Sequence, residues 1–223
     1  MGRNVIVLFD GTWNNIKDDT NVVRMRDAID STGEHDPNQP YKYLTGVGTS
    51  WHNRLTGGLF GRGLSENIQA GYAWLSALCQ PADQIYVFGF SRGAYTARSL
   101  VGLIRKCGLI KSPASLEEAY TLYRDKSVAP KDDKAVAFRA AHSRETRVRF
   151  IGVWDTVGSL GVPLSGVPFS RDYYAWHDTA LSKIVDYAYH AIAADERRAD
   201  YKPAVWTSDS KQKDAENIDV EQR

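Results

Sequence analysis

The stretch DQIYVFGFSRGAYTARSLVGL, residues 83–103, decides the fold. Its first part, Ile85 to Phe88, is a short uncharged run of β-branched and aromatic residues, which predicts a strand buried on both faces. The sequence GFSRG follows at residues 89–93, and residues 94–103 have a spacing compatible with a helix. A strand, G-x-S-x-G and a helix in that order are typical of a nucleophile elbow, where the serine stands on a sharp turn at the top of a sheet. Ser91 is therefore the candidate nucleophile.

The two glycines of this stretch support the prediction for a steric reason. Side chains at Gly89 and Gly93 would collide where the helix crosses the strand closely. A serine between glycines is also common in ordinary turns and at helix N-caps, which leaves Ser91 a purely structural alternative. The strand before it and the helix after it favour the catalytic interpretation.

Length and composition bound the class of protein. The 223 residues fit one domain with a sizeable core. Charged residues make up 25%, hydrophobic residues 43%, and the net charge is +1, so neither nucleic acid nor an anionic membrane surface is favoured as a partner. There is no Sec-type leader and no stretch of apolar residues long enough to span a membrane, so we expect a cytoplasmic protein whose export, if any, is independent of Sec. Cys79 and Cys107 lack metal or redox spacing and are expected to be buried thiols.

Residues 4–9, NVIVLF, form a second β-branched run and lead into Asp10, Gly11 and Thr12. In an open parallel sheet the carboxyl ends of the strands share one rim, where ligands bind, so we expect this loop beside Ser91. Asp10 is then a candidate for substrate binding. The backbone N–H groups of Gly11 or Thr12, together with that of Arg92, are candidates for an oxyanion hole. A tight Asp-Gly turn is the structural alternative.

Residues 148–153, VRFIGV, predict a further strand that delivers Asp155 to the same rim. Triads of α/β-hydrolases run in the order Ser, Asp or Glu, then His, so Asp155 is the candidate that orients and stabilises the histidine. An Asp that caps a helix or a turn is the alternative. His190 follows in order within residues 182–198, where we predict a helix, and it is either the general base or a buried core residue. The other histidines have weaker support: His35, His52, His142 and His177.

Two other functions for Asp10 deserve comparison. Phosphatases of the haloacid dehalogenase type use an Asp nucleophile two residues earlier, and Leu8 stands there, so this function is excluded. Asp10 and Asp155 together could also bind Mg²⁺ or Ca²⁺ as strand-end carboxylates. We predict no metal and no cofactor, and keep the cation site as an alternative.

The remaining segments predict an α/β architecture. Helices are expected at residues 20–29 and 64–78, a strand at 41–44, and a long Gly-rich loop at 46–63. The polar residues 112–145 predict a helical insertion over the sheet. We therefore expect one α/β-hydrolase-like domain over residues 1–223, with a mainly parallel sheet and helices on both faces.

Five blocks of the sequence resemble one known family. They are FDGTWNN at 9–15, GVGT at 46–49, GFSRGAYTAR at 89–98, GVWDTVGSLG at 152–161 and HAIAADERR at 190–198. Their order and spread are similar to those of the α/β-hydrolase-like domain family that includes the phospholipase effectors of bacterial type VI secretion. The resemblance implies a serine esterase that cleaves carboxylic esters of lipids, as a phospholipase does, with Ser91 as nucleophile and Asp155 in the triad.

The same resemblance bears on partners and completeness. It implies a lipid or another ester as substrate. It is also compatible with a cognate immunity or inhibitor protein as partner. Members of the family continue past the equivalent of Arg223 into a segment that carries a histidine, so we expect a domain that is incomplete at its C-terminus. A catalytically incomplete hydrolase fold used as a binding or interaction module is therefore the alternative function.

Overall fold

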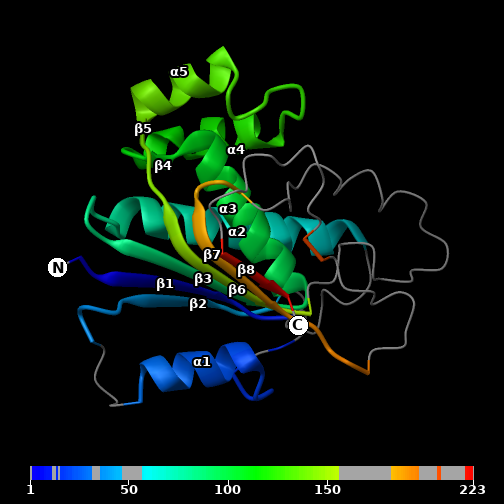
Figure 1. The fold of residues 1–223 in the computed structure, drawn as a ribbon. Helices are drawn as coiled ribbons and strands as arrows, with labels where there is room; N and C mark the ends of the chain where they lie inside the picture. The colour runs from blue at the N-terminus through cyan, green and yellow to red at the C-terminus, as the bar shows by residue number, and fades with distance from the viewer. Residues whose placement is uncertain are drawn as a thin grey trace.

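A twisted sheet with helices on both of its faces forms the centre of the molecule (Figure 1). In the computed structural model the described residues are 2–11, 14, 16–31, 36–46, 57–155, 182–195, 205–206 and 219–222. The sheet has the strand order β2-β1-β3-β6-β7-β8, and every neighbouring pair is parallel. Its strands are β1 (Asn4–Phe9), β2 (Tyr41–Leu44), β3 (Gln84–Phe90), β6 (Val148–Trp154), β7 (Val185–Ala191) and β8 (Asp219–Gln222). The expected α/β-hydrolase-like fold class is confirmed.

Helices cover the two faces unequally. One face carries α1 (Asn21–Ile29), and the other carries α2 (Gly57–Leu78) and α3 (Arg92–Cys107), as Figure 1 shows. Successive residues of a strand point to opposite faces, so an unbroken apolar run fills both layers. In β1, Val7 therefore packs on the α2 and α3 side, and Leu8 belongs to the cluster on the α1 side.

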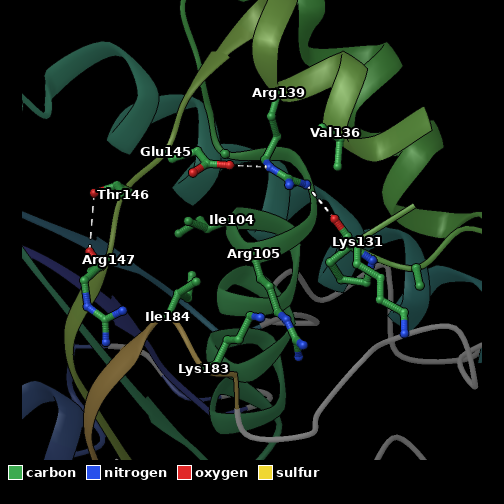
Figure 2. A pocket seen from close by; sticks show the side chains of 13 residues that line it. Ile104, Arg105, Lys131, Val136, Arg139, Glu145, Thr146, Arg147, Lys183 and Ile184 are labelled. Atoms are coloured by element: carbon green, nitrogen blue, oxygen red, sulfur yellow. Dashed lines mark hydrogen bonds and ion pairs between the residues drawn. The ribbon is translucent and has the colours of Figure 1, made fainter. Parts of the chain in front are cut away.

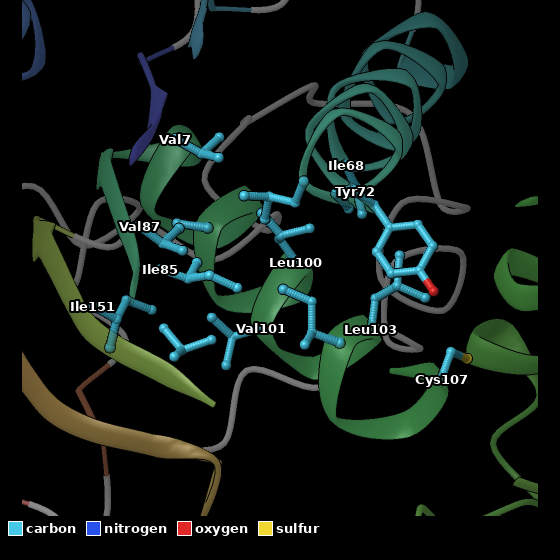
Figure 3. Packing of buried hydrophobic residues seen from close by; sticks show 14 of the residues in the cluster. Val7, Ile68, Tyr72, Ile85, Val87, Leu100, Val101, Leu103, Cys107 and Ile151 are labelled. Carbon is cyan, nitrogen blue, oxygen red and sulfur yellow. The ribbon is translucent and has the colours of Figure 1, made fainter. Parts of the chain in front are cut away.

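The larger core lies between the sheet and the two long helices (Figure 3). Val87 and Ile151 from neighbouring strands face Leu100 and Val101 of α3 in this view. Tyr72 of α2 belongs to the same buried cluster. The free thiols of Cys79 and Cys107 are buried, as predicted. This core anchors α3, the helix that follows the candidate nucleophile.

The helical insertion predicted between residues 112 and 145 is present over the α3 side. It contains a short 3₁₀-helix, η2, and two helices whose base is closed by an antiparallel two-stranded ribbon. These elements are β4 (Leu109–Ile110), η2 (Pro113–Ser115), α4 (Leu116–Arg124), α5 (Asp133–His142) and β5 (Ser143–Arg144). The ammonium of Lys106 on α3 donates to the carbonyl of Asp125 at 2.6 Å, which ties the insertion to that helix.

Two expectations for the secondary structure were wrong. Residues 185–191 form strand β7 and not a helix, because the alternating burial of Ala188 and His190 against the exposed Tyr189 suits pairing with β6. Helix α2 begins at Gly57, seven residues before the expected start at Leu64. The short β8 pairs with β7 at the edge of the sheet.

An ion pair fastens the start of β1 to the start of β3. The carboxylate of Asp83 accepts hydrogen bonds from Arg3 Nη2 at 2.7 Å and from the backbone N–H groups of Arg3 and Gln80, both at 2.9 Å. Its side chain is only 3% exposed. The hydrogen bonds from the Arg3 guanidinium lower the pKa of Asp83 from 3.8 to about 2.

This ion pair predicts a pH-dependent loss of stability. A carboxyl group whose pKa is lower in the folded state stabilises the fold above its unfolded-state pKa and loses that contribution as the pH falls through the folded-state value. We expect Asp83→Asn to lower the free energy of unfolding by about 2 kcal/mol at neutral pH, a difference that shrinks between about pH 4 and pH 2. Urea unfolding at a series of pH values measures it.

The matched control is Asp19→Asn. Asp19 also pairs with an arginine, Arg24, but its side chain is 70% exposed, so we expect little change at any pH. A loss in Asp83→Asn that stays constant from neutral pH to pH 2 would contradict the assignment.

Candidate active site

Ser91 occupies the sharp turn between β3 and α3 in a strained conformation. Its backbone has φ 55° and ψ −118°, which side-chain-bearing residues rarely adopt. The Ser91 N–H donates to the carbonyl of Trp154 on β6 at 2.8 Å, and its own carbonyl accepts from Ala94 and Tyr95 in the first turn of α3. The serine stands at the N-cap of α3 but makes no side-chain capping bond, so the N-cap alternative does not describe it.

The flanking glycines allow the strand and the helix to approach this closely. A Cβ atom on Gly89 would clash with the carbonyl oxygen of Gly93 and lie 2.7 Å from the Cα of Ala94. One on Gly93 would clash with the carbonyl of Phe9 and lie 2.5 Å from that of Asp10. All these neighbours are backbone atoms, which cannot move aside as a side chain can. The steric prediction for the two glycines is confirmed.

The N-terminus of α3 supplies a positive electrostatic environment next to Ser91. Arg92 is the first residue of this 16-residue helix, and the first N–H groups of a helix lack intrahelical acceptors. Of the other two oxyanion candidates, Gly11 donates its N–H to Asp10 Oδ1 at 2.7 Å, and Thr12 lies outside the described residues. The Gly11 N–H is therefore already engaged, whereas the Arg92 N–H lies at the start of α3.

Asp10 is buried and organises the first loop through its hydrogen bonds. Its carboxylate is 2% exposed and accepts from Tyr43 O–H at 2.6 Å, Thr20 O–H at 3.0 Å and the Gly11 N–H. Burial and this bond to Asp10 raise the pKa of Tyr43 above its ordinary value. Thr20 also caps α1 by accepting from the N–H of Val23, so the carboxylate joins β1, α1 and β2. Sequence reasoning missed Tyr43, whose only signal was its place near the carboxyl end of a predicted strand.

Asp155 lies directly after β6, at the strand end next to that of Ser91. Its backbone has φ 43°, and its N–H donates to the carbonyl of Ala191 on β7 at 2.9 Å. Its Oδ1 accepts from the N–H of Ala193, and its Oδ2 has no hydrogen-bond partner among the residues that the structure describes. The structure thus brings Ser91 and Asp155 to one rim, with the Ser91 N–H bonded to the residue before Asp155.

His190 lies away from this pair. It is the register partner of Val153, is 2% exposed, and its ring packs against Trp206 with centroids 5.5 Å apart. Two strand spacings of about 4.8 Å and two residues along the strand place its Cα roughly 12 Å from that of Ser91. The structure therefore does not bring His190 to the nucleophile.

The other histidines do not complete a described triad. His142 ends α5 in the insertion, where its Nδ1 lies 3.4 Å from Ser115 Oγ. His35, His52 and His177 fall outside the described residues. Within the described ranges no three His, Cys, Asp or Glu side chains gather as a metal site, and Asp10 is already surrounded by hydrogen-bond donors. None of the described helices is long and apolar enough to cross a membrane.

Comparison with known proteins agrees with this geometry at the level of family. The family model described as "T6SS, Phospholipase effector Tle1-like, catalytic domain" matches residues 3–223. The uncharacterized protein YEL023C of Saccharomyces cerevisiae is 29% identical over 236 residues, which cover 92% of this chain and 33% of that protein. The chain thus spans about a third of the length of this relative.

One solved structure is similar in outline. The crystal structure of an uncharacterized protein from Pseudomonas aeruginosa matches with a TM-score of 0.49 and 15% sequence identity. The match covers 99% of this chain and 40% of the other.

The close approach at the elbow predicts a large effect of one methyl group. We expect Gly93→Ala to lower the free energy of unfolding by about 3 kcal/mol, because its Cβ would meet two backbone carbonyls that belong to β1 and its loop. Chemical denaturation followed by circular dichroism measures the loss.

Gly71→Ala is the matched control, because its Cβ would meet the tip of the Phe9 side chain and no backbone atom of a neighbouring element in the described chain. Alanine also gains about 1 kcal/mol of helix propensity over glycine in α2, which offsets the crowding. Equal losses in the free energy of unfolding of Gly93→Ala and Gly71→Ala would contradict the importance of the close contact between α3 and the end of β1.

Proposed function

The chain belongs to the Tle1-like phospholipase effector catalytic domain family, and from this premise we propose that it hydrolyses carboxylic ester bonds of phospholipids with Ser91 as the nucleophile. One observation carries the proposal: Ser91 is held at φ 55° at the N-terminus of α3 without using its hydroxyl as a helix cap. A hydroxyl presented in this way is available for attack on an ester carbonyl.

The proposed reaction passes through an acyl-enzyme. Ser91 Oγ attacks the ester carbonyl and loses its proton to a base, while the Arg92 N–H and the end of α3 stabilise the developing oxyanion. The alcohol leaves with that proton. Water then gives a proton to the same base and attacks the acyl-enzyme, and Ser91 Oγ takes the proton back as the fatty acid is released. Asp155 orients and stabilises the histidine that serves as base, through its Oδ2.

The position of His190 does not support it as this base. A base must come within about 3 Å of the serine hydroxyl, and His190 lies on β7, where its ring packs against Trp206. We therefore propose that His190 packs and supports the core below the rim. Because a similar sequence occurs in Saccharomyces cerevisiae, we propose the reaction alone and assign the chain no part in secretion.

Fluorophosphonate labelling tests the nucleophile. We expect the probe to label the wild-type protein and not Ser91→Ala, since only an activated serine reacts. Ser99→Ala is the control, because Ser99 is fully buried on the same helix, and it should label as the wild type does. A folded wild-type protein that takes up no probe, or Ser91→Ala labelled like the wild type, would overturn the proposal.

Substitution of Asp155 tests its role as the acid of the triad. We expect Asp155→Asn to slow the release of fatty acid from phospholipid vesicles by about 10⁴-fold in kcat with KM nearly unchanged, because the histidine loses its orientation and its counter-charge. His190→Ala should retain most of the turnover and lower the melting temperature, because a buried ring is removed. A loss of activity in His190→Ala as large as that in Ser91→Ala would instead make His190 the base.

The remote position of His190 favours one alternative, a hydrolase fold that binds lipid without cleaving it. If the protein is such a module, the wild type and Ser91→Ala should bind phospholipid vesicles with the same affinity, and neither should release fatty acid. Co-sedimentation together with a fatty-acid assay separates the two functions in one experiment.

A further inference from the structure

A hollow lies near the amino ends of β6 and β7, and Figure 2 shows the side chains that line it. Its volume is about 750 Å³, within the range of pockets that bind small molecules. It is bordered by the last turn of α3, the loop between α4 and α5, and the segments that enter β6 and β7. Because Ser91 and Asp155 follow the carboxyl ends of their strands, the hollow is separated from them by the length of a strand, roughly 23 Å for seven residues.

The lining of this hollow is strongly basic. Five cationic side chains border it, against the single carboxylate of Glu145: Arg105, Lys131, Arg139, Arg147 and Lys183. Arg139 and Arg147 have carboxylate partners. Arg139 donates to Glu145 at 2.9 Å, and Arg147 donates to Asp186 at 2.6 Å. Arg105 and Lys131, which come from two separate segments, have no carboxylate partner among the described residues and leave a surplus of positive charge (Figure 2).

Arg105 is the clearest example, within the described chain, of a cation without a negatively charged partner. Its Nε is buried, and no acceptor for it lies in the part of the chain that the structure describes. Lys131 likewise has no carboxylate partner within the described ranges. A buried donor without an acceptor is unfavourable, and such groups in native proteins are commonly satisfied by an ion, water or ligand.

The end of the helix does not account for these cations. Positive side chains often stabilise the free carbonyls of a last helical turn. In α3, however, Arg139 donates to the carbonyl of Lys106 at 3.0 Å, and Tyr72 donates to that of Gly108 at 2.8 Å. The carbonyl of Ile104 accepts from the Gly108 N–H. These three carbonyls thus have other donors, and the Nε of Arg105 bonds to none of them.

We propose that this hollow binds a phosphoryl group carried by a small organic molecule or a lipid headgroup. A phosphoryl group carries up to two negative charges and several acceptor oxygens, which match the guanidinium of Arg105 and the ammonium of Lys131 better than a single carboxylate does. The volume exceeds that of bare phosphate, so the group arrives attached to an organic moiety. The site is independent of the proposed esterase reaction, because it shares none of its residues.

Calorimetry on the full chain tests the site with defined probes. The soluble probe is glycerol 3-phosphate, and the lipid probe is phosphatidylcholine vesicles with and without phosphatidic acid. We expect binding of one or both, weakened about tenfold or more in Arg105→Gln and in Lys131→Gln, because each loses a charge-assisted contact. Glu145→Gln should bind more tightly than the wild type, since it removes the competing carboxylate.

Controls separate the site from general charge effects and from the esterase. Arg24→Gln removes one positive charge from the exposed surface of α1 and should leave the affinity unchanged. Ser91→Ala should also bind normally, so a failed esterase leaves this result intact. Binding of glycerol 3-phosphate identifies a soluble phosphate ester, and binding of phosphatidic acid vesicles alone identifies a lipid headgroup. No binding to either probe, or equal affinities in Arg105→Gln, Lys131→Gln and the folded wild type, would overturn the proposal.

Discussion

The contact between the backbone of Gly93 and the carbonyls of Phe9 and Asp10 is the constraint on which the candidate site depends. There is no room for a side chain between the first turn of α3 and the end of β1. The helix must therefore start beside the strand end, and the chain reverses over a single residue, Ser91. The positive φ of that residue follows from the tight reversal, and the backbone on both sides of it is held by hydrogen bonds.

A strained turn of this kind persists only when its surroundings stabilise it. A residue in such a conformation costs about 1–3 kcal/mol, whereas burying one leucine contributes roughly 1.5–3 kcal/mol. Helix α3 buries Leu100 and Leu103 completely against the sheet and α2. The core on that face is thus sufficient to keep Ser91 in a conformation that it would not adopt alone, and the presentation of the hydroxyl is tied to the packing of the helix behind it.

The sequence predicts the elbow well and β7 poorly, for a physical reason. Around Ser91 the signals are local: an apolar run, two glycines and a helical spacing all agree. In residues 184–191, Ile184, Tyr187, Ala188 and Ala191 fit a helical spacing, while the burial of Ala188 and His190 fits a strand. Only the pairing with β6, more than thirty residues away, decides between them. The role of Asp10 was obscured in the same way, because its partner Tyr43 is 33 residues distant.

The helical insertion contains none of the residues proposed for catalysis, yet it contributes to the geometry of the rim through α3. This helix is about 24 Å long, and its two ends are held by different parts of the chain. At the N-terminus the contact is with β1. At the C-terminus Arg139 of α5 binds the carbonyl of Lys106, and the ammonium of Lys106 binds the carbonyl of Asp125 after α4. A helix fixed at both ends cannot slide along its axis, so the insertion helps to keep the start of α3, and with it Ser91, in register with the strand ends.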